Sequence, residues 1–115
     1  MGIFPIYGTL KTALAATLAQ FINREVTVAG CIATARRART SDGRIVGFVT
    51  IEDSSGLAEV TFFPDKIGQY QNLSSASSAV GGFGLVWVTG KVSQHLSSIT
   101  VECRNSGPVP HQFHD

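Results

Sequence analysis

Four arginines lie within nine consecutive positions of a chain that carries little charge elsewhere. They are Arg36, Arg37, Arg39 and Arg44, and the single acidic residue among them is Asp42. Guanidinium groups hold their charge at physiological pH and bind phosphate oxygens through paired hydrogen bonds. A cluster of this kind suits contact with the phosphates of a nucleic-acid backbone. The alternative is a solvated loop whose charges only aid solubility.

Two phenylalanines, Phe48 and Phe63, fall on the polar sides of two predicted strands that follow the arginines. Side chains alternate between the two faces of a strand, so the apolar set of each strand marks the side that faces the core. These apolar sets are Val49 and Ile51 in the first strand, and Ala58, Val60 and Phe62 in the second. We therefore expect Phe48 and Phe63 on an outer surface, where aromatic rings can stack on bases. For Phe63 the alternative is burial under the segment that follows it.

Thr61 shares the outer side with Phe63, and Lys91 is out of phase with the valines of its own predicted strand. Both are therefore added to the expected surface. The predicted nucleic-acid-binding residues are Arg36, Arg37, Arg39, Arg44, Phe48, Thr61, Phe63 and Lys91.

Catalytic and metal-binding motifs are absent from the sequence. No paired acid and base, nucleophile elbow or phosphate-binding loop is present. His111 and His114 have only Asp115 as a nearby potential ligand, which makes a metal site improbable. We expect a non-enzymatic protein without a metal or another cofactor.

The 115 residues, 43% hydrophobic and 15% charged, fit one domain with one core, and the net charge is only +1. Two cysteines, Cys31 and Cys103, lie in apolar stretches and are expected to be reduced, although a disulfide between neighbouring strands stays open. No apolar run approaches the ~20 residues needed to cross a bilayer, and no secretory leader is visible. We expect a cytoplasmic protein with no membrane partner.

Hydrophobic periodicity divides the chain into a helix and five strands. Residues 9–24 have apolar side chains at helical spacing, with Thr9 as the expected N-cap, and predict an α-helix. Residues 39–44 predict a turn, so that Arg36, Arg37 and Arg39 are expected on the loop between the first two strands. The predicted strands are 25–34, 45–53, 57–64, 85–92 and 97–104, with a short helix at 65–73 and a flexible loop at 74–84.

Five strands with a helix or a long connector between the third and fourth predict an all-β, five-stranded OB-fold, which is a Greek-key barrel. A five-stranded SH3-like barrel is the alternative, but it lacks a long insert after the third strand. We expect a helical lead segment at 1–23, the barrel at 24–106 and an extended tail at 107–115.

The region from 24 to 104 resembles the OB-fold domain of the bacterial replicative DNA polymerase III alpha subunit. The resemblance is carried by Gly30, by the basic segment from Arg36 to Thr40, and by the motifs 43–56, 59–64 and 88–92 (GRIVGFVTIEDSSG, EVTFFP and VTGKV). The central motifs occur in weaker form in the anticodon-binding barrels of class II aminoacyl-tRNA synthetases and in other single-strand-binding OB domains.

The resemblance implies contact with single-stranded DNA, as a part or a relative of such a subunit, with other domains or subunits of a replication complex as partners. It does not imply polymerisation, because the polymerase carboxylates and the His-rich metal-binding domain of that family have no counterpart here. An RNA-binding barrel of the anticodon-recognition type and a protein-interaction barrel are the alternatives.

Overall fold

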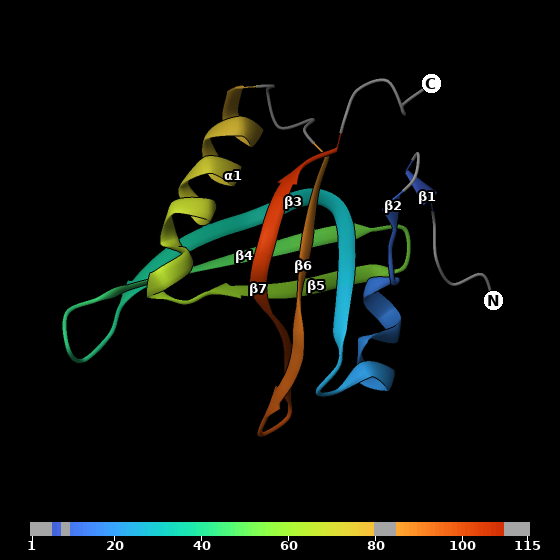
Figure 1. Ribbon diagram of the computed structural model, residues 1–115, viewed down its shortest axis with the longest axis horizontal. Helices are drawn as coiled ribbons and strands as arrows, with labels where there is room; N and C mark the ends of the chain where they lie inside the picture. The colour runs from blue at the N-terminus through green and yellow to red at the C-terminus, as the bar shows by residue number, and fades with distance from the viewer. Residues whose placement is uncertain (1–5, 8–9, 80–84, 110–115) are drawn as a thin grey trace.

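A computed structural model describes the backbone of residues 6–7, 10–79 and 85–109, with the side chains of 12–74 and 85–109. Five strands form a closed barrel in the order β3-β4-β5-β7-β6, which confirms the predicted OB-fold (Figure 1). Their bounds are β3 Glu25–Arg39, β4 Ile45–Asp53, β5 Gly56–Phe62, β6 Leu85–His95 and β7 Ser98–Pro108. The pair β5 and β7 is parallel, and every other neighbouring pair in the barrel is antiparallel. Two short strands, β1 Ile6–Tyr7 and β2 Leu10–Lys11, pair with each other outside the barrel.

The long strand β3 closes the barrel by pairing with two partners in succession. Its first half, to Cys31, pairs with β6, and the rest, from Cys31 to Arg39, pairs with β4. The strand has to bend where it changes partners, and Gly30 lies at this point. A Cβ on Gly30 would stand 2.1 Å from the carbonyl oxygen of Glu52, so only glycine permits this approach of the two backbones.

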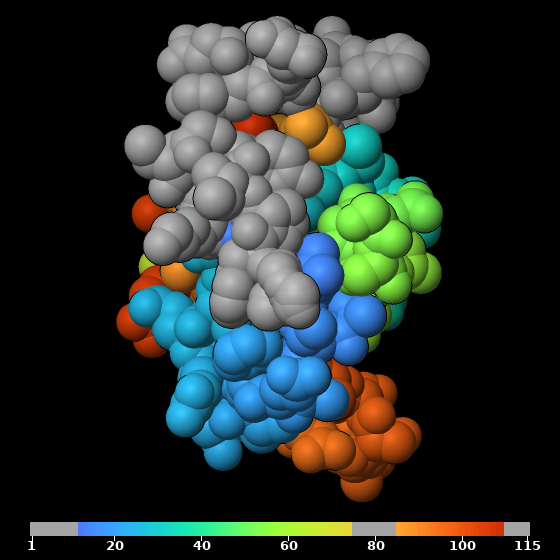
Figure 2. Space-filling model, turned by 90° about the vertical axis from the view of Figure 1, so that its right-hand side faces the viewer, coloured from blue at the N-terminus to red at the C-terminus, as the bar shows by residue number. Residues whose placement is uncertain are grey.

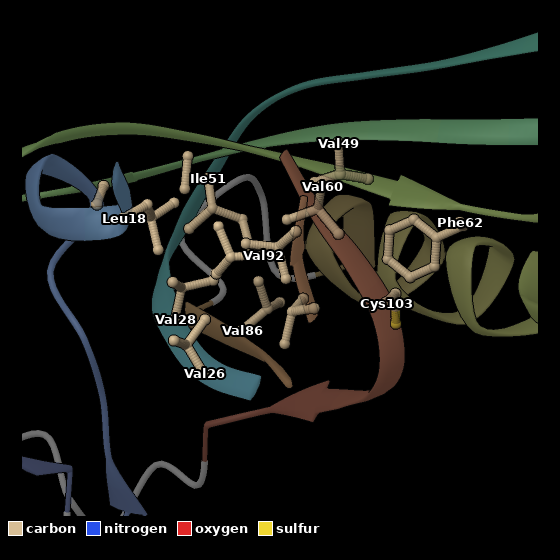
Figure 3. Packing of buried hydrophobic residues seen from close by; sticks show 14 of the residues in the cluster. Leu18, Val26, Val28, Val49, Ile51, Val60, Phe62, Val86, Val92 and Cys103 are labelled. Carbon is tan, nitrogen blue, oxygen red and sulfur yellow. The ribbon is translucent and has the colours of Figure 1, made fainter. Parts of the chain in front are cut away.

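The barrel interior is filled by alternate side chains of all five strands (Figure 3). Val49, Ile51, Ala58, Val60 and Phe62 are each at most 1% exposed, which confirms the predicted core faces of β4 and β5. The helix α1, Ile67–Ala79, closes one end of the barrel, and its Tyr70 meets Phe62 edge to face with ring centres 5.9 Å apart. Such a pair adds about 0.5–1.5 kcal/mol to the stability gained from burial alone.

The predicted N-terminal α-helix is wrong in type and in length. Residues 15–21 form a 3-10 helix, η1 Ala15–Phe21, and Leu14 before it is extended. The chain is extended here because the Ala13 N–H donates to the Thr27 carbonyl at 2.7 Å, which ties the segment to β3. Leu18 is nevertheless buried in the core, so the apolar spacing predicted its burial correctly. The backbone conformation of the segment is determined by tertiary contacts rather than by local helix propensity. Figure 2 shows this blue segment packed beside the green β4–β5 turn.

The connector and the last strand are more ordered than expected. The α-helix runs to Ala79, so residues 74–79 of the predicted loop are helical, and 80–84 lie outside the described residues. The last strand continues to Pro108 rather than ending at 104, because residues 105–108 pair with β6. The tail histidines, His111 and His114, also lie outside the described residues.

Both cysteines are free thiols, Cys31 half-buried and Cys103 buried, so the disulfide left open by the sequence does not form. Burial raises the pKa of Cys103 to about 11.

In the part of the chain that the structure describes, no helix has the length and apolar character to cross a membrane.

Candidate functional site

One row of side chains crosses the outer surface of all five barrel strands. Arg36 on β3 is paired with Phe48 on β4, and Phe48 with Thr61 on β5. The row continues from Thr61 to Glu102 on β7 and from Glu102 to Lys91 on β6. Four of the eight predicted site residues therefore share one line across the barrel, although they are up to 55 positions apart in the sequence.

The basic and aromatic members of this row touch each other. The guanidinium carbon of Arg36 lies 4.2 Å from the centre of the Phe48 ring, a cation–π contact. Phe48 is half-buried and Arg36 is exposed. Thr61 is paired with Phe48, but at 8% exposure it is buried, which corrects the prediction of an accessible binding residue at this position.

The arginines do not lie on a loop, which corrects the expectation for Arg36, Arg37 and Arg39. All three belong to β3 and are paired with β4 as far as Arg39 and Ile45. The turn beyond them is short, since the Gly43 N–H donates to the Thr40 carbonyl at 2.9 Å, and the strands therefore stay paired up to it. In Figure 1 this hairpin tip is the teal loop that projects past α1.

Because the arginines lie on a paired strand, they are divided between its two faces. Arg36 is on the Phe48 face. Arg37 is paired with Gly47, and the face of Gly47 is the one against which Tyr70 of α1 packs. Arg39 follows Arg37 at an interval of two and lies on that same opposite face. Only Arg36 among the three is thus aligned with the aromatic row.

Two of the arginines stabilise the hairpin turn. Arg39 donates to the Gly43 carbonyl at 2.8 Å, and Arg44 forms an ion pair with Asp42 at 2.9 Å. The Thr40 hydroxyl also donates to Asp42, and this bond, followed by those from Arg44, lowers the pKa of the Asp42 carboxyl. The Arg39 and Arg44 side chains are exposed, so their positive charge stays at the surface. Some of their N–H donors are already engaged by the Gly43 carbonyl and the Asp42 carboxylate.

Phe63 and Lys91 come together in a shallow pocket of about 320 Å³ at the far end of the row. Phe63 follows β5 directly and is 44% exposed, as predicted for a surface aromatic residue. The pocket is lined by Phe63, Asp65, Lys66, Lys91, Glu102, Cys103 and Arg104. Phe48 and Phe63 thus mark two ends of one outer surface.

Sequence reasoning missed Lys66, Glu102 and Arg104. The signal for the last two was available, because Val101 and Cys103 are apolar and the residues that alternate with them must point outward. Arg104 forms an ion pair with Glu25 at 3.1 Å. Lys66 could not be placed from the sequence, since it lies in the short 3-10 helix η2, Pro64–Lys66, whose direction depends on the barrel.

Asp53 has a structural role rather than a chemical one. One carboxylate oxygen accepts from the N–H groups of Ser55 and Gly56 and from the Ser55 hydroxyl, and so caps the turn between β4 and β5. Its other oxygen accepts from the Ala15 N–H at 2.8 Å and so fixes the start of η1.

Within the described ranges, no group of three His, Cys, Asp or Glu side chains is placed to hold a metal ion.

No protein family model and no curated protein sequence matches the chain. Solved structures share its fold. Asparaginyl-tRNA synthetase from Pyrococcus horikoshii superposes with a TM-score of 0.65 at 15% identity, over 88% of this chain and 23% of that chain. An OBody bound to hen egg-white lysozyme superposes with a TM-score of 0.61 at 19% sequence identity, over 92% of this chain and 97% of that chain. The mitochondrial single-stranded DNA binding protein of S. cerevisiae superposes with a TM-score of 0.56 at 13% sequence identity, over 74% of this chain and 94% of that chain.

The chain therefore spans about a quarter of the synthetase that it resembles, and nearly the whole of the other two. At these identities the likeness establishes the OB-fold and no more.

Proposed function

We propose that this chain is a non-enzymatic domain that binds single-stranded DNA across the outer surface of β3, β4 and β5. The observation that carries the proposal is the contact between Arg36 and Phe48 on paired strands. A strand laid along this surface would place a phosphate near Arg36 and a base against the Phe48 ring. Lys91 and Phe63 offer a second cation and a second ring at the other end of the row.

The fold supports this use of the surface. OB-folds bind oligonucleotides on the face of their second and third strands, which here are β4 and β5. Stacking on an aromatic ring contributes about 1–3 kcal/mol per base and tolerates any base, whereas cations follow the phosphates. One of the similar structures is a mitochondrial single-stranded DNA binding protein.

RNA is the second candidate ligand. The chain also resembles part of an asparaginyl-tRNA synthetase, and the surface holds nothing that distinguishes ribose from deoxyribose. A protein partner is the third, because an OBody of the same fold binds lysozyme. Competition of oligo-U against oligo-dT separates the first two, and binding that nucleic acid does not displace would identify the third.

The narrower assignment, to a part or relative of a DNA polymerase III alpha subunit, rests on the motif at 43–64. Several residues of that motif have structural roles in this hairpin: Val49 and Ile51 fill the core, and Asp53 caps the turn. Such residues are needed in any hairpin of this geometry. The motif is therefore stronger support for the OB-fold than for the assignment to a polymerase subunit.

The test is fluorescence anisotropy of labelled oligo-dT against the full chain at several salt concentrations. In the variant Arg36→Ala/Lys91→Ala, two phosphate contacts are removed. The slope of log affinity against log salt should become shallower by about 1.4, at roughly 0.7 per contact on a single strand.

The matched control is Arg37→Ala/Arg39→Ala, which removes the same charge from the opposite face of the hairpin. It should lower affinity only slightly and leave the slope almost unchanged. Equal effects of the two variants would show that only the overall charge matters. Absence of binding at low salt would overturn the proposal.

A further inference from the structure

The Glu102 carboxylate is an unusual group for a surface that is proposed to bind a polyanion. It is half-buried and lines the pocket that also contains Phe63 and Lys91. Its direct cross-strand neighbours are Thr61 and Lys91. In the described part of the chain, no ion pair or hydrogen bond involves this carboxylate, even with the adjacent Lys91.

A carboxylate in this position repels phosphates but accepts hydrogen bonds from bases. Guanine presents two neighbouring donors, N1–H and the N2 amine, that match the two oxygens of a carboxylate. Cytosine and adenine each present one amine beside a ring nitrogen acceptor, and thymine presents one N–H between two carbonyl oxygens. Bidentate pairs with a charged partner are the stronger and more selective ones.

The rest of the pocket fits one nucleotide. Its volume of about 320 Å³ is at the lower end of the range for small-ligand sites, which is about 300–1,000 Å³. The exposed ring of Phe63 provides a stacking surface, and Lys66 and Lys91 lie where they can neutralise the flanking phosphates. The carboxylate comes from β7 and the ring from the residue after β5. The two lysines come from η2 and β6.

We propose that this pocket selects a guanine nucleotide of the bound strand, which stacks on Phe63 and donates its N1–H and N2 amine to Glu102. This inference rests on the proposed function, since it assigns a base preference to one part of the same surface. Phe48 and Arg36, at the other end of the row, would bind without base preference.

The test compares 9-mer oligo-dT with the same oligonucleotide carrying a single central dG, dC, dA or deoxyinosine, by competition anisotropy with the full chain. Deoxyinosine keeps N1–H and lacks the N2 amine, so it isolates the second donor. We expect dG to bind about tenfold more tightly than dT, as one charged hydrogen bond predicts, and deoxyinosine to fall between them.

Glu102→Gln should remove the dG preference while binding of plain oligo-dT stays the same or improves, because a negative charge is lost. The matched control is Glu59→Gln, an exposed carboxylate on the outer side of β5, which should keep the preference. Phe63→Leu should weaken the dG-containing strand more than plain oligo-dT. Unchanged melting temperatures of the variants would show that they are folded.

Equal binding of dG and dT, or tighter binding of dC or dA than of dG, would overturn this inference and leave the proposed function standing. Failure of every oligonucleotide to bind would overturn both.

Discussion

The Arg36 guanidinium lies over the Phe48 ring, with 4.2 Å between the guanidinium carbon and the ring centre. The two residues are direct neighbours on β3 and β4, so the contact is set by strand register rather than by a flexible loop. A base that stacks here meets a planar cation and an aromatic ring together. This arrangement makes the two residues energetically dependent on each other.

We therefore expect a double-mutant cycle of Arg36→Ala and Phe48→Leu to be non-additive in oligo-dT affinity. Each single change should weaken binding, and the double variant should lose less than the sum, by about 0.5–1 kcal/mol. The reason is that removal of either group leaves the other without its stacking partner. Anisotropy titrations of the four proteins measure the coupling.

The control for this cycle combines Phe48→Leu with Arg37→Ala, which lies on the opposite face of the same strand. These changes should add within about 0.5 kcal/mol. An additive result for Arg36 with Phe48 would contradict a shared binding surface.

Gly47→Ala should destabilise the fold by about 1–3 kcal/mol, the usual cost of overpacking. A Cβ at Gly47 would stand 2.5 Å from the Tyr70 ring, so α1 would have to move away from the end of the barrel. Urea unfolding followed by circular dichroism measures the change.

Gly68→Ala is the matched control, because it makes the same substitution in α1 where nothing lies within 4 Å of the new Cβ. It should stabilise the chain by about 0.5–1 kcal/mol, since alanine is the better helix former. Equal effects of the two substitutions would show that the packing of Tyr70 on Gly47 does not matter.

The core could be predicted from the sequence because each face of a strand is set by alternation alone. Val60 and Phe62 are buried as expected, and Phe63 is exposed as expected. The helix type of residues 15–21 could not be predicted, because it depends on hydrogen bonds that Ala15 and Ala16 donate to the side chains of Asp53 and Ser55, which are 38 and 39 positions away. Local propensity cannot contain that information.

For the candidate site, the sequence indicated several of the residues but not how they are arranged on the barrel. Arg36 and Phe48 were both identified, but their contact depends on a register that the length of the hairpin turn sets. The division of Arg36 from Arg37 follows from β3 continuing as a paired strand, whereas the sequence indicated a loop after residue 34. Alternation with Val101 and Cys103 indicated that Glu102 points outward, but its place beside Phe63 and Lys91 in one pocket depends on the barrel.

Asp53→Ala should cost about 1–3 kcal/mol of stability, because it leaves several N–H groups without acceptors at once. The carboxylate accepts from Ser55 and Gly56 within the turn and from Ala15 in η1. Hydrogen exchange should therefore become faster at Ala15 as well as at Ser55. The neighbouring exposed carboxylate provides the control, since Glu52→Ala should change stability by less than about 0.5 kcal/mol. Exchange that accelerates only in the turn would mean that Asp53 does not anchor the N-terminal segment.

Cys103 should make the stability of the fold decrease at alkaline pH. Burial raises the pKa of its thiol from an ordinary 9.0 to about 11. Between these two values the unfolded chain releases the thiol proton and the folded chain retains it, so the folded state binds more protons. Stability is then fully present below about pH 9 and is lost as the pH rises toward 11.

The measurement is urea unfolding at a series of pH values from 8 to 11, in a Cys31→Ser background that leaves Cys103 as the remaining cysteine. The comparison protein is Cys31→Ser/Cys103→Ala, which titrates in the same way except for this thiol. The first protein should lose stability more steeply, and its thiol should react with a disulfide reagent at pH 8 only after urea is added. Parallel pH profiles, or rapid labelling of the folded protein, would show that Cys103 is not held protonated by burial.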